Sequence, residues 1–346
     1  MSNLQIGLAI AGGVVLAAVV AHGAWSSRKN TPRQALPEPG SGMQADPMRE
    51  PVMGDDEQVT QPMTLPPVAR RSVMDSLIDV IATIALDGPS LVVSGEAAIA
   101  AMPATRRAGS KPFAIEGYNL TTLTWEAPVP GHRYGGFQAG VQLANRSGAL
   151  NEIEYSEFVV KTQAFADAIN ATPEFPEMLE EVARARELDQ FASAHDAQLG
   201  FTIRARNASW SPGYVQQNAA RLGFVAGVIP GRMVLPASTE GLAPVLVLSF
   251  DSQAALAEDP AQSAIRDIAL HLDVAQVDRN EHPFDRMREV AAALAQTMDG
   301  VVTDDNGQLL TAQTMDVIGT ELQILYDTLE QRDLAAGSLL ARRLFA

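Results

Sequence analysis

One apolar stretch near the start of the chain limits what the chain can fold into. Residues 6–25 read IGLAIAGGVVLAAVVAHGAW and contain no Asp, Glu, Lys or Arg. About 20 apolar residues form a helix long enough to cross a bilayer, and such a helix satisfies its own backbone hydrogen bonds in lipid. We therefore predict a transmembrane helix over residues 6–25.

Basic residues follow this stretch and do not precede it. Residues 1–5 carry no Lys or Arg, whereas Arg28, Lys29 and Arg33 come directly after the apolar stretch. Basic residues favour the cytoplasmic side, so the short N-terminus is expected outside and the bulk of the chain in the cytoplasm. A cleaved signal peptide, which is the alternative, carries its positive charge before the apolar region.

Composition excludes several classes of function. The chain of 346 residues has no cysteine and a formal net charge of −16. Disulfides and thiolate metal sites are therefore impossible. Nucleic acids and anionic lipid surfaces select Lys and Arg, so the charge predicts that neither is a partner of the soluble part.

The residues after the predicted span read as a linker. Residues 26–70 are rich in Pro, Gly, Gln and charge and show no apolar period. Such a segment cannot bury enough apolar surface to offset its ordering entropy, so we predict a disordered linker. As a coil it would span roughly 35–40 Å. The composition becomes globular at about residue 72.

Two helices and a turn are predicted near the end of the chain. Apolar residues recur at spacings of three and four over 284–298, after a proline suited to a first helical turn. A second stripe covers 315–329, with Thr311 as its expected N-cap. Between them, Asn306-Gly307 predicts a hairpin turn, because both residues tolerate a positive φ.

Strands are predicted at 199–205, 245–250 and 268–274. In the last of these, Ile268, Leu270, Leu272 and Val274 alternate with smaller or polar residues. This alternation is typical of an antiparallel strand with one buried face.

An internal repeat divides the globular part into residues 72–195 and 196–334. Phe175 and Met178 match Phe284 and Met287 in similar amphipathic segments. Each copy would be an α+β unit. The alternative is that two helices share a common amphipathic pattern by chance. Residues 335–346 form the C-terminal tail. Within it, 339–346 are amphipathic, and we expect a packed or frayed helix end rather than a binding motif.

Three segments resemble the ZipA family of membrane-anchored, FtsZ-binding cell division proteins. They are HGAWSSRKN at 22–30, NAARLGFVAG at 218–227 and FDRMREVAAALAQTMDGVVTDDNGQLLTAQTM at 284–315. The third segment is the most specific, because helix, hairpin and helix agree with the family in spacing and residue type.

The resemblance implies a fold class, a location and a function. The fold would be α+β: a transmembrane helix, a disordered linker and two tandem ZipA-C-like units, each an antiparallel sheet with helices on one face. The other sheet face of the second unit would bind the C-terminal tail of FtsZ in a shallow apolar groove. The protein would tether division filaments to the cytoplasmic face of the inner membrane at the division site.

The candidate groove residues lie on the predicted strands and loops of the second unit. They are Phe201, Thr202, Arg204, Ile229, Met233, Val245, Val247, Ala269 and His271. Phe201 would reach the groove only in one of two strand registers, since a slip of one residue exchanges the faces. In the first unit, Phe137, Val141 and Leu143 share one predicted strand face and offer a further candidate surface.

Polar residues in this groove motivate an alternative function. Ala269 stands where the family places a large aromatic residue, which weakens the case for FtsZ binding. The chain could instead be a ZipA-like scaffold for another envelope or divisome protein.

The sequence offers no catalytic, cofactor or metal site, and we predict that the chain is not an enzyme. None of its five histidines has a partner at metal-ligand spacing on a helix. It has no P-loop, nucleophile elbow or phosphate-binding glycine motif. Asp304 and Asp305 invite a metal or acid–base interpretation, but we favour a role in shaping the hairpin.

Overall fold

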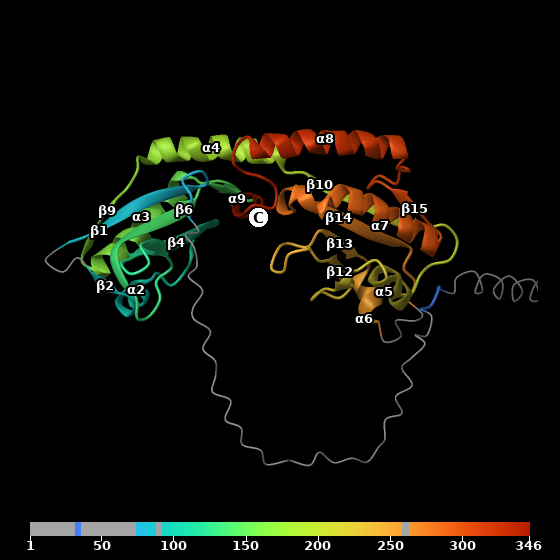
Figure 1. Ribbon diagram of the computed structural model, residues 1–346, viewed down its shortest axis with the longest axis horizontal. Helices are drawn as coiled ribbons and strands as arrows, with labels where there is room; N and C mark the ends of the chain where they lie inside the picture. The colour runs from blue at the N-terminus through green and yellow to red at the C-terminus, as the bar shows by residue number, and fades with distance from the viewer. Residues whose placement is uncertain (1–31, 36–73, 88–91, 258–262) are drawn as a thin grey trace, which may run out of the picture. The chain divides into compact units, whose positions relative to one another are not determined.

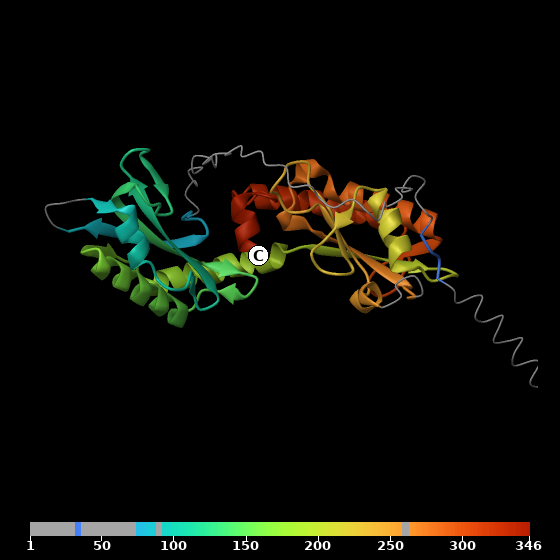
Figure 2. The ribbon, with the colours of Figure 1, turned by 90° about the horizontal axis from the view of Figure 1, so that it is seen from below.

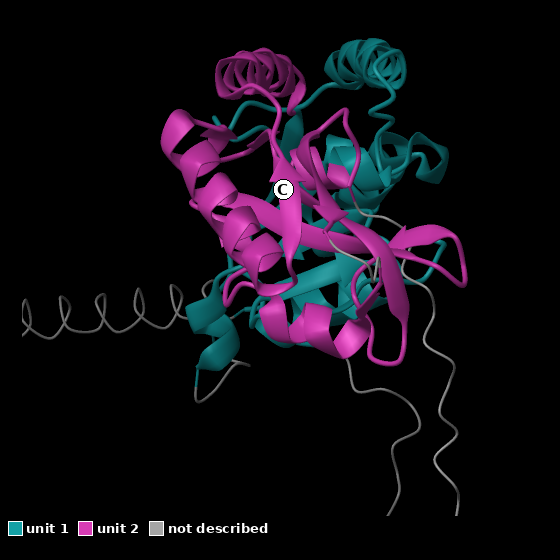
Figure 3. Ribbon diagram, turned by 90° about the vertical axis from the view of Figure 1, so that its left-hand side faces the viewer, with its two compact units in different colours: residues 1–40, 197–341 teal, residues 41–196, 342–346 magenta. Residues whose placement is uncertain are grey.

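The computed structural model describes residues 32–35, 74–87, 92–257 and 263–346. Its contacts divide the chain into two compact units, coloured in Figure 3. We call residues 41–196 and 342–346 the N-terminal unit, and residues 1–40 and 197–341 the C-terminal unit. The last five residues of the chain thus belong with the unit formed mainly by residues that precede position 197.

The C-terminal unit contains a six-stranded antiparallel sheet (Figure 1). Its strand order is β11-β12-β13-β14-β10-β15. The strands are β10 (Gln198–Ala205), β11 (Val225–Ala226), β12 (Arg232–Leu235), β13 (Leu246–Ser249), β14 (Asp267–Asp273) and β15 (Gly300–Thr303). The three predicted strands are therefore confirmed, with shifts of one residue at some ends.

Register fixes which face of this sheet is buried. Phe201 pairs with Leu270, and Ile203 pairs with Ile268, and all four side chains are buried. The ring of Phe201 contacts the ring of Phe284 on α7 in an edge-on arrangement at 6.3 Å. One face of the sheet therefore packs against the helices, and the alternate residues point to the other face.

The helices of this unit begin where the sequence places their start signals. They are α5 (Pro212–Ala220), α6 (Ser252–Leu256), α7 (Pro283–Met298) and α8 (Ala312–Glu330). Pro283 occupies the first turn of α7, and the side chain of Thr311 accepts a hydrogen bond from Thr314 N at the start of α8. Both predicted helices and the predicted N-cap are confirmed.

The turn between β15 and α8 forms where it was predicted, but of its two central residues Gly307 has a positive φ and Asn306 does not. Gly307 has a φ of 79°, and an isolated bridge joins Thr303 to Leu309. The carboxylate of Asp304 accepts hydrogen bonds from the backbone N–H groups of Asn306 at 2.9 Å and Gln308 at 2.7 Å. Asp304 therefore shapes the turn, as the sequence favours.

The N-terminal unit is a second antiparallel sheet with helices. Its main strands run in the order β3-β4-β6-β1-β9, and β2 and β5 pair at the side. The strands are β1 (Asp79–Leu86), β2 (Val93–Ser94), β3 (Arg107–Ala108), β4 (Lys111–Asn119), β5 (Thr124–Glu126), β6 (Arg133–Gln142) and β9 (Ala171–Glu174), with a separate hairpin of β7 (Ala144–Asn145) and β8 (Gly148–Ala149). The helices are α2 (Gly95–Ala101), α3 (Glu152–Ala168) and α4 (Met178–His195).

Aromatic contacts join α3 to this sheet. Phe158 meets Phe113 at 6.0 Å, and Phe165 meets Phe137 at 5.3 Å, both edge-on. In Figure 2, α3 lies along one side of the blue-green strands. These contacts place the core of the unit between α3 and the sheet.

The two units share the order and register of their central elements. The strand order β4-β6-β1-β9 corresponds to β13-β14-β10-β15, and each last strand follows a helix, α3 or α7. Leu86 pairs with Ala171 as Ala205 pairs with Gly300. The residue before each last strand, Asn170 or Asp299, has a positive φ.

This correspondence differs from the alignment predicted from sequence. By chain order α3 stands in the place of α7, and α4 stands in the place of α8. The predicted match of Phe175 and Met178 to Phe284 and Met287 therefore aligns α4, which follows the last strand of its sheet, with α7, which precedes the last strand of its sheet. Two amphipathic segments of similar pattern caused that misalignment.

A short piece of the predicted linker packs on the C-terminal unit. Arg33 N donates to Ser209 O at 2.7 Å, and Ser211 N donates to Arg33 O at 2.9 Å. The guanidinium of Arg33 pairs with the carboxylate of Asp299 at 3.0 Å. Residues 32–35 thus extend the structure beside Trp210.

No helix within the described ranges has the length and apolar character needed to cross a membrane. The predicted span over 6–25 and most of the predicted linker lie outside the residues that the structure describes.

Candidate functional site

A groove opens on the face of the C-terminal sheet that α7 does not cover. Its volume is about 600 Å³. It is lined by Gln198, Leu199, Gly200, Arg232, Ala243, Pro244, Val245, Val247, Ser249, His271, Leu272, Asp273, Gln276 and Asp305. We call it the open-face groove.

The open-face groove has an apolar wall and charged ends. Val247 lies on β13 and pairs with His271 on β14, whereas Val245, which directly precedes β13, lines the groove but is only 1% exposed. Arg232 pairs with Ser249 at one side of this row, and Asp273 lies at the other end of β14. A peptide with apolar side chains and charges at both ends fits such a surface.

A glycine leaves room in the floor of the groove. Gly200 pairs with His271, and a Cβ atom at Gly200 would lie 3.0 Å from Oδ1 of Asp305. The Asp305 carboxylate therefore reaches over the strand from the turn after β15. Asp304 and Asp305 have separate roles, since the first shapes the turn and the second lines the groove.

The predicted groove residues divide into four groups, of which three are at least partly exposed or line the groove and the fourth is buried in the core. Val245, Val247 and His271 line the groove. Thr202 and Ala269 pair with each other on the same open face. The remaining exposed candidates lie away from the groove lining: Arg204, which pairs with Asp267 at 2.7 Å, and Ile229, which is 56% exposed in the loop before β12.

Phe201 and Met233 do not line the groove. They are 2% and 5% exposed, and they lie on the helix-facing side of the sheet. Both are core residues, because large apolar side chains gain most where the helices exclude water. The other predicted aromatic surface needs the same correction, since Phe137 and Val141 are fully buried in the core of the N-terminal unit.

Sequence reasoning missed several polar members of the groove. These are Gln198, Arg232, Ser249, Asp273 and Asp305. Strand alternation places the first four on the open face once the register of Phe201 is fixed. Asp305 had no comparable signal, because its position depends on the fold of the turn.

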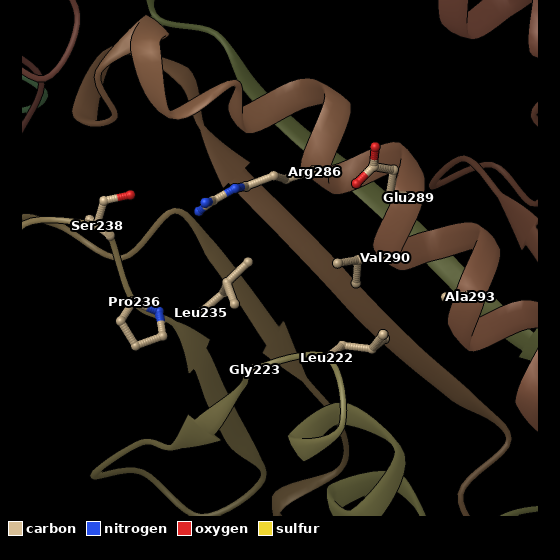
Figure 4. A pocket seen from close by; sticks show the side chains of 10 residues that line it. Leu222, Gly223, Leu235, Pro236, Ser238, Arg286, Glu289, Val290 and Ala293 are labelled. Atoms are coloured by element: carbon tan, nitrogen blue, oxygen red, sulfur yellow. The ribbon is translucent and has the colours of Figure 1, made fainter.

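A second cavity of about 500 Å³ lies on the helix side of the same unit. Figure 4 shows it between α7 and the end of β12, with Val290 and Leu235 facing each other across it. Two of its polar lining residues are engaged by Glu281, which accepts from Ser238 N and Oγ at 2.9 Å and pairs with Arg286 at 3.2 Å, and the cavity lies outside the open sheet face where the groove was predicted. The open-face groove is therefore the better candidate.

The N-terminal unit holds a buried polar cluster. Oε1 of Glu126 is bonded to His132 Nδ1 at 2.6 Å, Asn119 Nδ2 at 2.7 Å and Tyr134 Oη at 3.0 Å. Burial raises the pKa of Glu126, but the hydrogen bonds outweigh burial and hold the pKa below its usual range. No group of three or more His, Asp and Glu side chains within the described ranges is arranged to hold a metal ion.

Comparison with known families gives a match, which overlaps part of the groove lining. The sequence profile described as "ZipA, C-terminal FtsZ-binding domain" matches residues 250–321. The resemblance to the ZipA family is confirmed. The matched residues contain α6, β14, α7, β15 and the first half of α8, and thus His271, Asp273 and Asp305 of the open-face groove.

The match supports FtsZ binding in cell division, and the matched domain is a protein-binding domain rather than an enzyme. It covers part of the C-terminal unit and none of the N-terminal unit. A search among curated proteins gives no match.

Proposed function

We propose that this protein is a membrane-anchored adaptor that binds the C-terminal tail of FtsZ in the open-face groove. The observation that carries the proposal is the overlap between the ZipA match at 250–321 and one wall of that groove. Val245 and Val247 would receive the apolar side chains of the tail, and the charged ends would fix its direction.

The membrane anchor is proposed from the sequence. Residues 6–25 have the length and composition of a bilayer-spanning helix, and the basic residues follow them. This order supports a single-pass protein of the inner membrane with its units in the cytoplasm. Binding FtsZ would then hold division filaments at the membrane of the division site.

The N-terminal unit is proposed to be a second ZipA-C-like domain. The common strand order, the matching register of β1 with β9 and β10 with β15, and the positive φ of Asn170 and Asp299 support this proposal. The domain boundaries would be about 72–195 and 196–334.

The decisive experiment is a titration of the full chain, in detergent, with a fluorescent peptide from the FtsZ tail of the same cell. We expect saturable binding that Val247→Glu weakens by at least about tenfold, because a buried charge would face the apolar side chains of the peptide. Val317→Glu is the matched control, since Val317 is 53% exposed on α8.

A third variant distinguishes the two cavities. Ala293→Glu places the same charge in the helix-side cavity shown in Figure 4. Weakening by Ala293→Glu but not by Val247→Glu would move the site to that cavity. Absence of saturable binding by the unmodified chain would reject FtsZ recognition and favour a ZipA-like scaffold for another envelope or divisome protein.

A further inference from the structure

The last five residues of the chain pack on the N-terminal unit. We call Arg342–Ala346 the tail segment. Nη1 and Nη2 of Arg343 donate to the two carboxylate oxygens of Asp79 at 2.9 and 2.6 Å. Gln142 Nε2 donates to the Arg343 carbonyl at 2.8 Å, and Arg146 N donates to the Ala346 carbonyl at 3.3 Å. Side-chain and backbone contacts both hold the segment.

The tail segment is deeply buried where it meets the unit. Leu344 and Phe345 are each 1% exposed, and Asp79 is 2% exposed. A carboxylate at such depth is costly unless it is paired, and the guanidinium of Arg343 supplies the pair. The buried contacts of the tail segment are thus made by an arginine followed directly by two large apolar side chains, Leu344 and Phe345.

The position of the tail segment corresponds to the open-face groove. Asp79 pairs with Gln142 at the first position of β1, and Gln198 pairs with Asp273 at the first position of β10. Both strands have eight residues and meet β9 or β15 at their far ends in the same register. Asp79 and Gln142 bind the tail segment, and their counterparts Gln198 and Asp273 line the open-face groove.

The site extends beyond its occupant. A cavity of about 470 Å³ is lined by Leu344 and Phe345 together with Ala192 of α4 and the turn between β7 and β8. A peptide longer than the tail segment, or one with bulkier side chains, would find additional surface there.

We propose that the N-terminal unit is a second peptide-binding site, specific for a short peptide in which an arginine is followed directly by two large apolar residues, as Arg343 is by Leu344 and Phe345. The tail segment occupies this site as an internal ligand. The groove of the C-terminal unit therefore remains the open site of each chain. The inference does not depend on FtsZ, because both the site and its ligand belong to this chain.

The test is binding in trans. A chain ending at Ala341 is titrated with a fluorescent, amidated peptide of residues 339–346, and anisotropy is measured. We expect saturable binding, at least about tenfold weaker for the peptide with Arg343→Ala. A peptide of the same composition with residues 343 and 344 exchanged is the matched control and should also bind weakly. The intact chain should bind little peptide, because its site is occupied.

A second measurement covers the outcome in which the shortened chain does not fold. In the full chain, Asp79→Asn should speed hydrogen exchange of residues 339–346 at least about tenfold while leaving exchange of α7 unchanged. Unchanged exchange of 339–346 would overturn the proposal. A folded shortened chain that binds no peptide at millimolar concentration would also overturn it, since the tail segment would then be packing alone.

Discussion

Replacing Arg343 by Met should destabilise the N-terminal unit strongly. The substitution removes the guanidinium that donates to both carboxylate oxygens of Asp79. The backbone N–H of Asp75, which donates to Asp79 Oδ2 at 2.8 Å, remains. Breaking a buried ion pair by removing one partner costs about 3–5 kcal/mol. The Arg343 side chain is 18% exposed, so we expect the lower end, about 3 kcal/mol.

A double-mutant cycle tests the origin of this cost. Hydrogen exchange of the β1 and β6 amides gives the free energy of opening for Arg343→Met, Asp79→Asn and the double variant. The double variant should cost little more than either single variant, because the second substitution removes a charge that has already lost its partner. Costs that add within about 0.5 kcal/mol would refute the assigned ion pair.

The cost should also depend on pH. Burial raises the pKa of Asp79 above its ordinary value of 3.8, and Arg343 counteracts part of this rise. Without Arg343 the pKa of Asp79 rises further, so the folded state holds the proton more tightly than the unfolded chain. The penalty is then small near pH 4 and grows as pH rises through the raised pKa. A penalty equal at about pH 4.5 and pH 7 would contradict this reasoning.

Three further predictions concern other elements of the fold. Thr311→Ala should lower the stability of the C-terminal unit by about 1 kcal/mol in thermal melts, because it removes the N-cap of α8. Glu126→Gln should lower the free energy of unfolding in urea by about 2 kcal/mol at neutral pH and by less in acid. The reason is that the lowered pKa of Glu126 stabilises the folded state at pH values above the ordinary carboxyl pKa, and this stabilisation is lost as pH falls through the lowered pKa. Burial raises the pKa of Tyr134, Tyr155 and Tyr326 to about 12. Absorbance at 295 nm should therefore show these three tyrosines ionising near pH 12, and the stability of the fold should fall as pH rises from about 10 towards 12.

Much of the C-terminal unit could be predicted from local sequence pattern. The stripes of α7 and α8 have the helical period, and Pro283 and Thr311 mark their starts. These signals depend on residues within one or two helical turns, so the helices can be predicted without knowledge of the tertiary fold.

The groove lining was harder to predict, because strand faces depend on register. Phe201 could lie on either face until its pairing with Leu270 placed it against α7. In β12, Met233 stands between Arg232 and Val234 in a strand of four residues, which is too short for alternation to identify the buried face.

Long-range contacts could not be predicted at all. The ion pair between Asp79 and Arg343 joins residues 264 positions apart. No local sequence pattern predicts such a contact, and the amphipathic pattern of 339–346 is equally compatible with a packed and with a frayed helix end. The correspondence of α3 with α7 was hidden for a similar reason, since it appears in strand order and not in shared residues.

In the proposed membrane-anchored protein, the contact between Arg33 and Ser209 would limit how far the C-terminal unit stands from the membrane. Six residues lie between Trp25, the end of the predicted span, and Pro32, so seven Cα–Cα steps join the two. Even fully extended they reach only about 25 Å. If the proposed anchor and FtsZ binding hold, an insertion between residues 25 and 32 would increase the greatest distance between a bound filament and the bilayer. An insertion between residues 40 and 70 would leave that spacing unchanged and lengthen only the connection to the N-terminal unit.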